Sequence, residues 1–283
     1  MEKIAFQGEH YAFSEMAANV FFKNQIDCLP CLTFEEVFRL VESKRVKYGI
    51  VPVENTIYGS IHRNLDLLLE SDVVIVGEVN LRIKLHLIGL PISGIDQIRT
   101  VHSHPAALEQ CRKFLATHPF IEAVSSYDTA GSVKLIYEKD DPAIAAIASR
   151  RAAQDYNMRI LQEGIEDYPE NYTRFFIISK ESHEIDIPTK TSIVLATKNI
   201  PGALFKSLSV FFLRDINLTK IESRPRKGQP WEYLFFLDFS GTLAEERIQN
   251  ALRHLEEITS FIKILGSYPA ARDLNGNYQI QTL

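Results

Sequence analysis

Several features that define whole classes of protein are scarce in this sequence. There are three cysteines and one tryptophan among 283 residues, and so few cysteines, odd in number, favour a reducing compartment over a disulfide framework. The formal net charge is only −5 at pH 7, which argues against a nucleic-acid partner because binding phosphates needs clustered Lys and Arg. No apolar run approaches the ~18 residues that a membrane-spanning helix needs. These absences predict a cytoplasmic protein with neither a nucleic-acid nor a membrane partner.

Two more absences concern targeting and metals. Residues 1–6 show no basic leader followed by an apolar stretch, so we expect no secretory signal. Cys28 and Cys31 have the C-x-x-C spacing of a redox or metal motif. However, no second Cys or His pair has zinc-like spacing, and a closed zinc site needs four ligands. We therefore expect two ordinary thiols and no metal site.

The first 179 residues alternate short β-branched runs with amphipathic stretches, which is typical of βαβ units. Thr33, with Glu36 three residues on, forms a capping box that predicts a helix start. This many units favours two lobes, with the chain crossing between them near Asn80 and Glu163. Lobe 1 is expected at about 1–79 and 161–180, and lobe 2 at about 80–160.

Residues 80–87 alternate apolar and polar side chains. A period of two predicts one half-buried strand. Its polar side chains, Arg82, Lys84 and His86, are expected on a solvated face.

The rest of the chain predicts a second, smaller domain. Residues 181–190 are polar, contain a proline and read as a linker. Residues 191–270 show the order βαββαβ, which is the ferredoxin-like split unit. Residues 271–283 form a C-terminal tail.

Seven short motifs, in order along the chain, resemble the prephenate dehydratase family. The first five resemble its catalytic domain and the last two resemble the ACT regulatory domain attached to it. They are Gly49-Ile50-Val51-Pro52-Val53-Glu54-Asn55-Thr56 with Gly59, Ser103-His104-Pro105 with Gln110 and Cys111, Asp128-Thr129-Ala130, Ala145–Ser149, Asn171-Tyr172-Thr173-Arg174-Phe175, Gly202-Ala203-Leu204, and Glu222-Ser223-Arg224-Pro225. The sequence departs from the family pattern at Glu9 and Tyr11, where proline and glycine are common, and at Asp128, where serine is usual.

The resemblance implies both a fold and a reaction. The fold is a two-lobed catalytic domain, like type II periplasmic binding proteins, followed by a ferredoxin-like ACT domain. The reaction converts prephenate into phenylpyruvate, CO2 and water without a cofactor. L-Phenylalanine is implied as the allosteric effector, with a homodimer formed through the ACT domains and a homotetramer built from two dimers. The alternatives are an arogenate dehydratase, which acts on the transaminated substrate, and a non-catalytic two-lobed ligand sensor.

The resemblance also implies where the site residues lie. Thr173 is placed at the departing hydroxyl; because the pKa of a threonine hydroxyl lies far from 7, it is expected to stabilise the leaving group electrostatically. The other residues implied to be catalytic are Asn55, Gln110 and Ser103. Those implied to bind substrate are Glu54, Thr56, Ser14, Thr129, Ala130, Asn171, Arg174 and Phe175. Those implied to bind the effector are Gly202, Ala203, Leu204, Asn217, Glu222, Ser223 and Arg224.

Elementary geometry refines these roles. Successive side chains of a strand point to opposite faces, so if Thr173 faces the site, Phe175 shares its side and Arg174 faces away into an ion pair. Ser14, Ser103 and Thr129 mark expected helix starts, whose free N–H groups attract anions.

Overall fold

The computed structural model describes residues 1–23, 26–182, 189–229 and 231–271. It divides into two compact units: unit 1 is Met1–Asn64 with Val79–Phe175, and unit 2 is Leu65–Glu78 with Phe176–Leu283. Most of the predicted linker, 183–188, and of the predicted tail, 272–283, lies outside the described residues. No helix in the described ranges is long and apolar enough to cross a bilayer.

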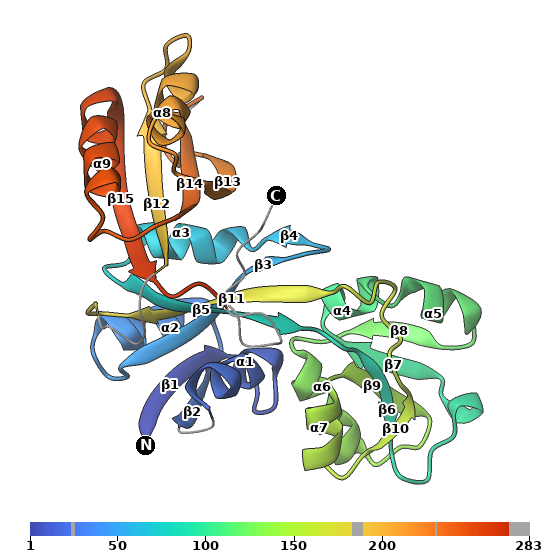
Figure 1. The fold of residues 1–283 in the computed structure, drawn as a ribbon. Helices are drawn as coiled ribbons and strands as arrows, with labels where there is room; N and C mark the ends of the chain where they lie inside the picture. Colours follow the sequence, from blue (N-terminus) through green and yellow to red (C-terminus); the bar gives the residue numbers. More distant parts are fainter. Residues whose placement is uncertain (24–25, 183–188, 230, 272–283) are drawn as a thin grey trace. The chain divides into compact units, whose positions relative to one another are not determined.

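The first sheet is mixed, with strand order β2-β1-β3-β11-β5, and β4 pairs with β3 (Figure 1). Its residues belong to the first lobe of unit 1, except for parts of α3, β5 and β11 that fall in 65–78 and 176–179 of unit 2. Strand β1 runs parallel to both β2 and β3. The predicted helix start is confirmed at α2, where the Thr33 side chain accepts the backbone N–H of Glu36 at 3.2 Å. The second bond of a capping box differs, because the Glu36 carboxylate accepts the N–H of Leu32 at 3.1 Å and not that of Thr33. The elements are β1 (Glu2–Gln7), α1 (Phe13–Phe22), β2 (Ile26–Cys31), α2 (Phe34–Glu42), β3 (Tyr48–Asn55), β4 (Gly59–Ser60), α3 (His62–Glu70), β5 (Val74–Arg82) and β11 (Tyr172–Ser179).

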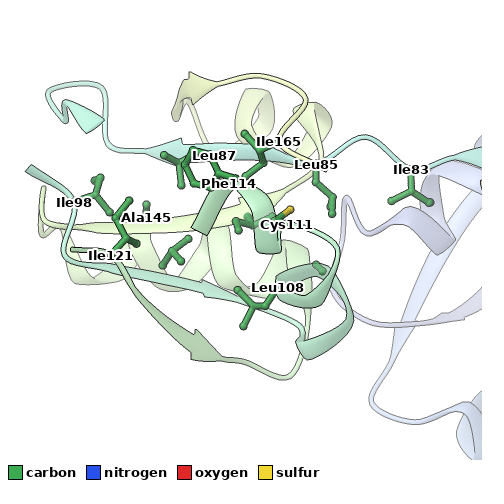
Figure 2. Close-up of a cluster of buried hydrophobic side chains, with 13 residues drawn as sticks. Ile83, Leu85, Leu87, Ile98, Leu108, Cys111, Phe114, Ile121, Ala145 and Ile165 are labelled. Atoms are coloured by element: carbon green, nitrogen blue, oxygen red, sulfur yellow. The ribbon is translucent and has the colours of Figure 1, made fainter. Parts of the chain in front are cut away.

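The second lobe of unit 1 has its own sheet, with order β10-β6-β9-β7-β8. Its core is a cluster of fully or nearly fully buried side chains that includes Leu87, Phe114 and Ile121 (Figure 2). The elements are β6 (His86–Gly89), a 3-10 turn (Ile95–Gln97), β7 (Thr100–Ser103), α4 (Pro105–Glu109), α5 (Arg112–Thr117), β8 (Glu122–Ser125), α6 (Thr129–Lys139), β9 (Ile144–Ala148), α7 (Arg150–Asp155) and β10 (Arg159–Gln162).

The single strand predicted over 80–87 is wrong in one respect, because β5 ends at Arg82 and β6 begins only at His86. In the gap the chain crosses between the lobes and bonds to the returning segment instead of to a sheet neighbour. The Ile83 N–H donates to the Asn171 carbonyl at 2.7 Å, and the Leu85 N–H donates to the Glu166 carboxylate at 3.0 Å. The two crossing segments are therefore tied to each other.

His86 also differs from the prediction of a solvated face. Its side chain is buried, and its Nδ1 accepts the Gly164 N–H at 3.2 Å. Burial is the main reason that the pKa of this imidazole is lowered. A neutral ring is favoured because burial penalises the charged form.

Unit 2 contains the predicted ferredoxin-like fold. Its sheet has the order β13-β14-β12-β15, and the β12–β14, β12–β15 and β13–β14 pairs are antiparallel. Side chains from β12, β14, α8 and α9, among them Ile193, Phe211, Phe239 and Leu252, form one apolar core. The elements are β12 (Lys190–Thr197), α8 (Ala203–Phe212), β13 (Leu218–Pro225), β14 (Tyr233–Ser240), α9 (Glu246–Ile258) and β15 (Thr259–Tyr268).

The segment Leu65–Glu78 belongs to unit 2 because β15 packs directly on it. The Lys263 ammonium donates to three carbonyls at the end of α3, those of Leu68, Leu69 and Ser71, at 2.9, 3.0 and 2.8 Å. A cation at this position satisfies carbonyls that have no partner within the helix and complements the helix dipole. At Gly266, a Cβ atom would lie 2.2 Å from the Ile75 carbonyl oxygen, so only glycine permits this approach.

Candidate active site

A pocket of about 480 Å³ opens in unit 1 and is lined by residues of both lobes. This volume falls within the range of small-molecule sites. Six of the residues predicted for catalysis or substrate binding line it: Ser14, Asn55, Gln110, Thr129, Thr173 and Phe175.

Asn55, at the end of β3, orients the Thr173 hydroxyl. The Asn55 Oδ1 atom accepts the backbone N–H groups of Ile57 at 2.9 Å and Tyr58 at 3.0 Å, which fixes the orientation of the amide. The Nδ2 group must therefore donate, and it does so to Thr173 Oγ1 at 3.0 Å. Because the Thr173 oxygen already accepts this bond, its own proton is available for an acceptor in the pocket.

Asn171 and Gln110 extend this network across the two lobes. Asn55 Nδ2 also donates to Asn171 Oδ1 at 2.8 Å, and Asn171 Nδ2 donates to Gln110 Oε1 at 2.8 Å. Asn171 is fully buried and does not line the pocket, whereas Gln110 does. Since Gln110 uses its oxygen here, its NH2 group is the end that a ligand can meet. The four side chains thus form one continuous hydrogen-bonded chain.

The alternation predicted for residues 173–175, at the start of β11, is confirmed. Phe175 lies on the Thr173 side of the strand and lines the pocket. Arg174 does not line it and forms an ion pair with Glu54, with Nη1 3.8 Å from Oε2. Both charged residues predicted to bind substrate therefore lie outside the pocket lining and contact each other.

Three other predicted residues have side chains engaged elsewhere. Ser103 is fully buried, and its hydroxyl donates to the Ile147 carbonyl at 2.6 Å. Thr56 donates to the Glu170 carbonyl at 2.9 Å, and Ala130 is buried within α6. None of the three lines the pocket.

The helix that follows Ser103 also begins differently from the prediction. The residue that caps α4 is His104, not Ser103: the imidazole Nδ1 accepts the Ala106 N–H at 3.2 Å. The reason is that Ser103 is still part of strand β7, where its hydroxyl bonds to β9. His104 itself lines the pocket, and burial lowers its pKa, so the neutral ring is favoured.

The pocket lining combines two acidic side chains, Glu35 and Asp128, with three helix starts. This lining, which lies entirely within the described residues, contains no lysine or arginine. Instead, the residues that cap α1, α2 and α6, namely Ala12, Thr33 and Asp128, all line it. Helix N-termini carry unpaired N–H groups and a partial positive charge of about half a unit each. Anion binding at the starts of α1, α2 and α6 stays a prediction, and at α6 the Gly131 N–H already donates to Asp128.

In the loop between β1 and α1, Tyr11 has a left-handed backbone conformation. Glycine is common at this position in the family. The φ of Tyr11 is +71°, which costs a non-glycine residue roughly 1–2 kcal/mol. Aromatic contacts offset this cost: the ring meets Tyr156 edge-on at 5.8 Å, and the Arg151 guanidinium lies 5.9 Å from its centre. The Tyr11 N–H also donates to the Glu15 carboxylate.

Asp128 is one of several pocket residues that were not assigned to the site from the sequence; Glu35 and His104 are others. Asp128 caps α6, with Oδ1 accepting the Gly131 N–H at 2.8 Å, and its side chain is 9% exposed. Burial raises the pKa of this carboxyl, although backbone hydrogen bonds partly oppose the rise. The sequence signal that could have identified it is an aspartate, before a predicted helix, at a position where the family usually has serine.

In unit 2, the residues predicted to bind the effector lie at the start of α8 and along β13. Gly202 caps α8 with φ +75°, and a Cβ there would meet nothing within 4 Å. Arg224 Nη2 donates to both carboxylate oxygens of Asp66, on α3, at 3.0 Å each. Burial alone would raise the pKa of Asp66, but Lys227 and Arg224 outweigh it and lower the pKa.

The three cysteines are free. Burial raises the pKa of Cys28 to about 12 and that of Cys31 to about 11, so both are thiols at neutral pH. That the C-x-x-C pair has no metal or redox role stays a prediction.

Known proteins share this architecture. The model of the family described as prephenate dehydratase matches residues 4–183. A bifunctional chorismate mutase/prephenate dehydratase of Aquifex aeolicus is 44% identical over 95% of this chain and 74% of its own length. The chloroplastic arogenate dehydratase/prephenate dehydratase 1 of Arabidopsis thaliana is 43% identical over 94% of this chain and 72% of its own length.

Two solved structures are similar over nearly the whole chain. The prephenate dehydratase of Arthrobacter aurescens in complex with L-Phe has a TM-score of 0.86 and 29% identity, covering 95% of this chain and 90% of that one. GqqA, described as a novel type of quorum-quenching acylase, has a TM-score of 0.84 and 32% identity, covering 95% and 98%. On the family model and the sequence identities, this chain belongs to the prephenate dehydratase family.

Proposed function

We propose that this protein is a prephenate dehydratase acting in L-phenylalanine biosynthesis. Prephenate, a dianion, takes up one proton and yields phenylpyruvate, CO2 and water. The bond from the ring to its carboxylate carbon breaks, its electron pair enters the ring, and the 4-hydroxyl leaves. The ring becomes aromatic, which supplies the driving force. The protein must hold a dianion and assist a poor leaving group.

The observation that carries this proposal is the orientation of the Thr173 hydroxyl. Asn55 donates to its oxygen, so its proton can be donated to the departing 4-hydroxyl. A threonine is too weak an acid to protonate this group outright. We assign it the role of stabilising the charge that develops on the leaving oxygen, with the proton supplied by water. Gln110, through its NH2 group, is assigned to the same end of the substrate or to a carboxylate.

The two carboxylates of the substrate are assigned to the helix N-termini. Ser14 and Thr129 stand in the first turns of α1 and α6 and line the pocket. Backbone N–H groups at such positions bind carboxylates and phosphates. Phe175 supplies an apolar wall for the ring, and a low-polarity environment favours loss of CO2.

The L-phenylalanine effector is assigned to unit 2, as an ACT domain. Its βαββαβ topology supports this, as does the left-handed Gly202 at a helix start, which leaves backbone N–H groups accessible to a carboxylate. The solved relative in complex with L-Phe is consistent with it. Feedback requires that L-phenylalanine bind one of two states more tightly.

A homodimer through unit 2, and a homotetramer built from two such dimers, is proposed as the assembly. Helix α8 leaves large apolar side chains in solvent: Phe205, Phe212 and Leu213 are 76, 79 and 69% exposed. Strand β13 is an edge strand of its sheet. Apolar surface beside an unpaired edge is typical of an interface. The free cysteines support the predicted cytoplasmic location.

The direct test is the formation of phenylpyruvate from prephenate by the purified protein, followed against a protein-free blank, with and without L-phenylalanine. Turnover that L-phenylalanine reduces is the expected result. Absence of phenylpyruvate with a folded protein would reject the activity. Turnover insensitive to L-phenylalanine would reject only the regulation.

A further inference from the structure

The imidazole of His104 has one ring nitrogen committed to the fold and one that is not. At the start of α4, its Nδ1 accepts the Ala106 N–H at 3.2 Å. A backbone N–H can only donate, so Nδ1 carries no proton and the neutral ring carries its proton on Nε2. In the part of the chain that the structure describes, Nε2 has no hydrogen-bond partner, and His104 is an exposed residue of the pocket lining. His104 therefore offers the pocket an N–H donor.

The proposed substrate needs more donors than the helix starts provide. Prephenate carries two carboxylates, whereas the lining contains two acidic side chains, Glu35 and Asp128, and no lysine or arginine. At the start of α6, the backbone N–H groups of Ala130 and Gly131 are already bonded to Asp128. Fewer backbone donors remain there for a substrate carboxylate, so side-chain N–H groups have to contribute to binding the dianion.

Four side chains of the lining carry N–H donors: Gln7, Asn55, His104 and Gln110. Asn55 uses its Nδ2 group on the Thr173 hydroxyl, at 3.0 Å. Of the other three, only His104 can gain a positive charge, which a bound carboxylate favours. Desolvation lowers the pKa of this imidazole, and the nearby Asp128 carboxylate opposes that shift. His104 is thus the lining side chain best suited to an anion.

One of the two substrate carboxylates fits such a donor better than the other. The ring carboxylate must lose its charge as its electron pair enters the ring and CO2 leaves. A hydrogen bond to it would stabilise the ground state more than the transition state and slow the reaction. The side-chain carboxylate keeps its charge throughout, so a hydrogen bond to it stabilises both states alike. Such uniform binding lowers KM and leaves kcat nearly unchanged.

We propose that His104 is a further substrate-binding residue, whose Nε2–H donates to the side-chain carboxylate of prephenate. The proposal rests on the dehydratase function proposed above and adds a donor to the same site. His104 precedes α4 and Gln110 follows it, and both line the pocket, so side-chain N–H groups flank this short helix at both ends. The imidazole adds a donor on the lobe whose α6 start is partly occupied by Asp128.

The test separates the two ring nitrogens with a pair of substitutions. In His104→Asn, Oδ1 can take the place of Nδ1 and cap α4, but no N–H stands at the position of Nε2. In His104→Gln, the side-chain NH2 can take the place of Nε2, but the acceptor at the position of Nδ1 is lost. KM for prephenate is measured from phenylpyruvate formation, and denaturant unfolding measures the stability of each variant.

His104→Asn is expected to raise KM about 10- to 100-fold, the range for losing a hydrogen bond to a charged group, with a much smaller change in kcat. His104→Gln is expected to keep a KM closer to that of the wild type and to unfold at a lower denaturant concentration, because the cap is lost. The matched control is His118→Asn, since His118 lies outside the pocket lining at the end of α5, and its KM should be unchanged.

The opposite pattern, with a normal KM in His104→Asn and an impaired His104→Gln, would identify His104 as a helix cap alone and overturn the inference. A wild-type KM in both variants, or the same rise in both, would overturn it as well. A wild type that forms no phenylpyruvate would overturn the proposed function and the inference with it. If His104→Asn does not fold, His104→Ser replaces it, because serine also caps a helix and has no N–H in its side chain.

Discussion

Replacing Asn55 by aspartate reverses the polarity of the atom that faces Thr173 while leaving its shape unchanged. The Oδ1 bonds from Ile57 and Tyr58 can remain. The new oxygen, however, must accept a proton where Nδ2 donated at 3.0 Å, so the Thr173 hydroxyl turns towards it and no longer serves the substrate. Loss of one donor to a developing oxyanion costs about 10²–10³ in kcat. Repulsion of the dianion by the added charge is expected to raise KM as well.

The same change is expected to destabilise the fold. The Asn171 Oδ1 and the Tyr172 carbonyl lose their donor, and an unsatisfied buried group costs about 1–3 kcal/mol. The free energy of unfolding should therefore fall by roughly 2–6 kcal/mol for the two acceptors together. Denaturant unfolding measures this quantity, and near-UV circular dichroism checks that the assayed protein is folded.

Two further variants separate the effect of the added charge from the effect of losing the hydrogen-bond donor. Asn55→Ala removes the donor without adding a charge and should lose kcat while changing KM less. Asn19→Asp adds the same charge on α1, where Asn19 lies outside the pocket lining, and should retain kcat. The reasoning is refuted if folded Asn55→Asp and Asn55→Ala proteins both keep kcat within threefold of the wild type.

Three other predictions concern stability and regulation. Asp66→Asn removes the partner of Arg224 and should cost about 1 kcal/mol at neutral pH, an amount reduced for partial exposure. The pKa of Asp66 is lowered in the folded state, so this stabilisation is complete above its unfolded pKa of about 3.9 and is lost as the pH falls through the folded value. The unfolding free energies of the wild type and of Asp66→Asn should therefore converge in acid. Burial lowers the pKa of His86, so the stability contributed by its neutral imidazole is complete above about pH 6.5 and declines at lower pH. In His86→Leu, the unfolding free energy should therefore fall less steeply between about pH 7 and 5 than in the wild type. Gly202→Val forces a β-branched residue to φ +75° and should weaken inhibition by L-phenylalanine with little change in uninhibited kcat; unaltered inhibition would remove Gly202 from the effector site.

Local pattern was sufficient for much of the fold. In unit 2 the order βαββαβ predicted over 191–270 matches the observed β12, α8, β13, β14, α9 and β15, because clear periodicity and turn residues mark the elements. Strand alternation likewise placed Arg174 and Phe175 on opposite faces, since that geometry is fixed by the backbone.

Tertiary contacts account for the rest. The alternation over 80–87 correctly marks Ile83 and Leu85 as buried, yet the strand is interrupted because the chain changes lobes there, which period two cannot reveal. The burial of His86 depends on the returning segment around Gly164. Ser103 was predicted to be a helix cap because serine and proline stand near the start of α4, but Ser103 is the last residue of strand β7.

Pairings between distant residues were also beyond sequence reasoning. The Asp66–Arg224 pair joins positions far apart in the chain, and no local signal indicates it. The Gln110–Asn171–Asn55 chain was predicted only as separate residues drawn from the resemblance. Their mutual hydrogen bonds, which orient Thr173, required the structure.

The central claim is that the Thr173 hydroxyl assists the departure of the substrate's 4-hydroxyl, and the pair Thr173→Val and Thr173→Ser tests it most directly. Valine has nearly the same shape without the hydroxyl, and serine retains the hydroxyl without the methyl group. The account predicts that kcat for prephenate falls about 10²–10³-fold in the valine variant, stays within about tenfold in the serine variant, and that both still bind L-phenylalanine. A folded Thr173→Val protein with kcat near that of the wild type would contradict it.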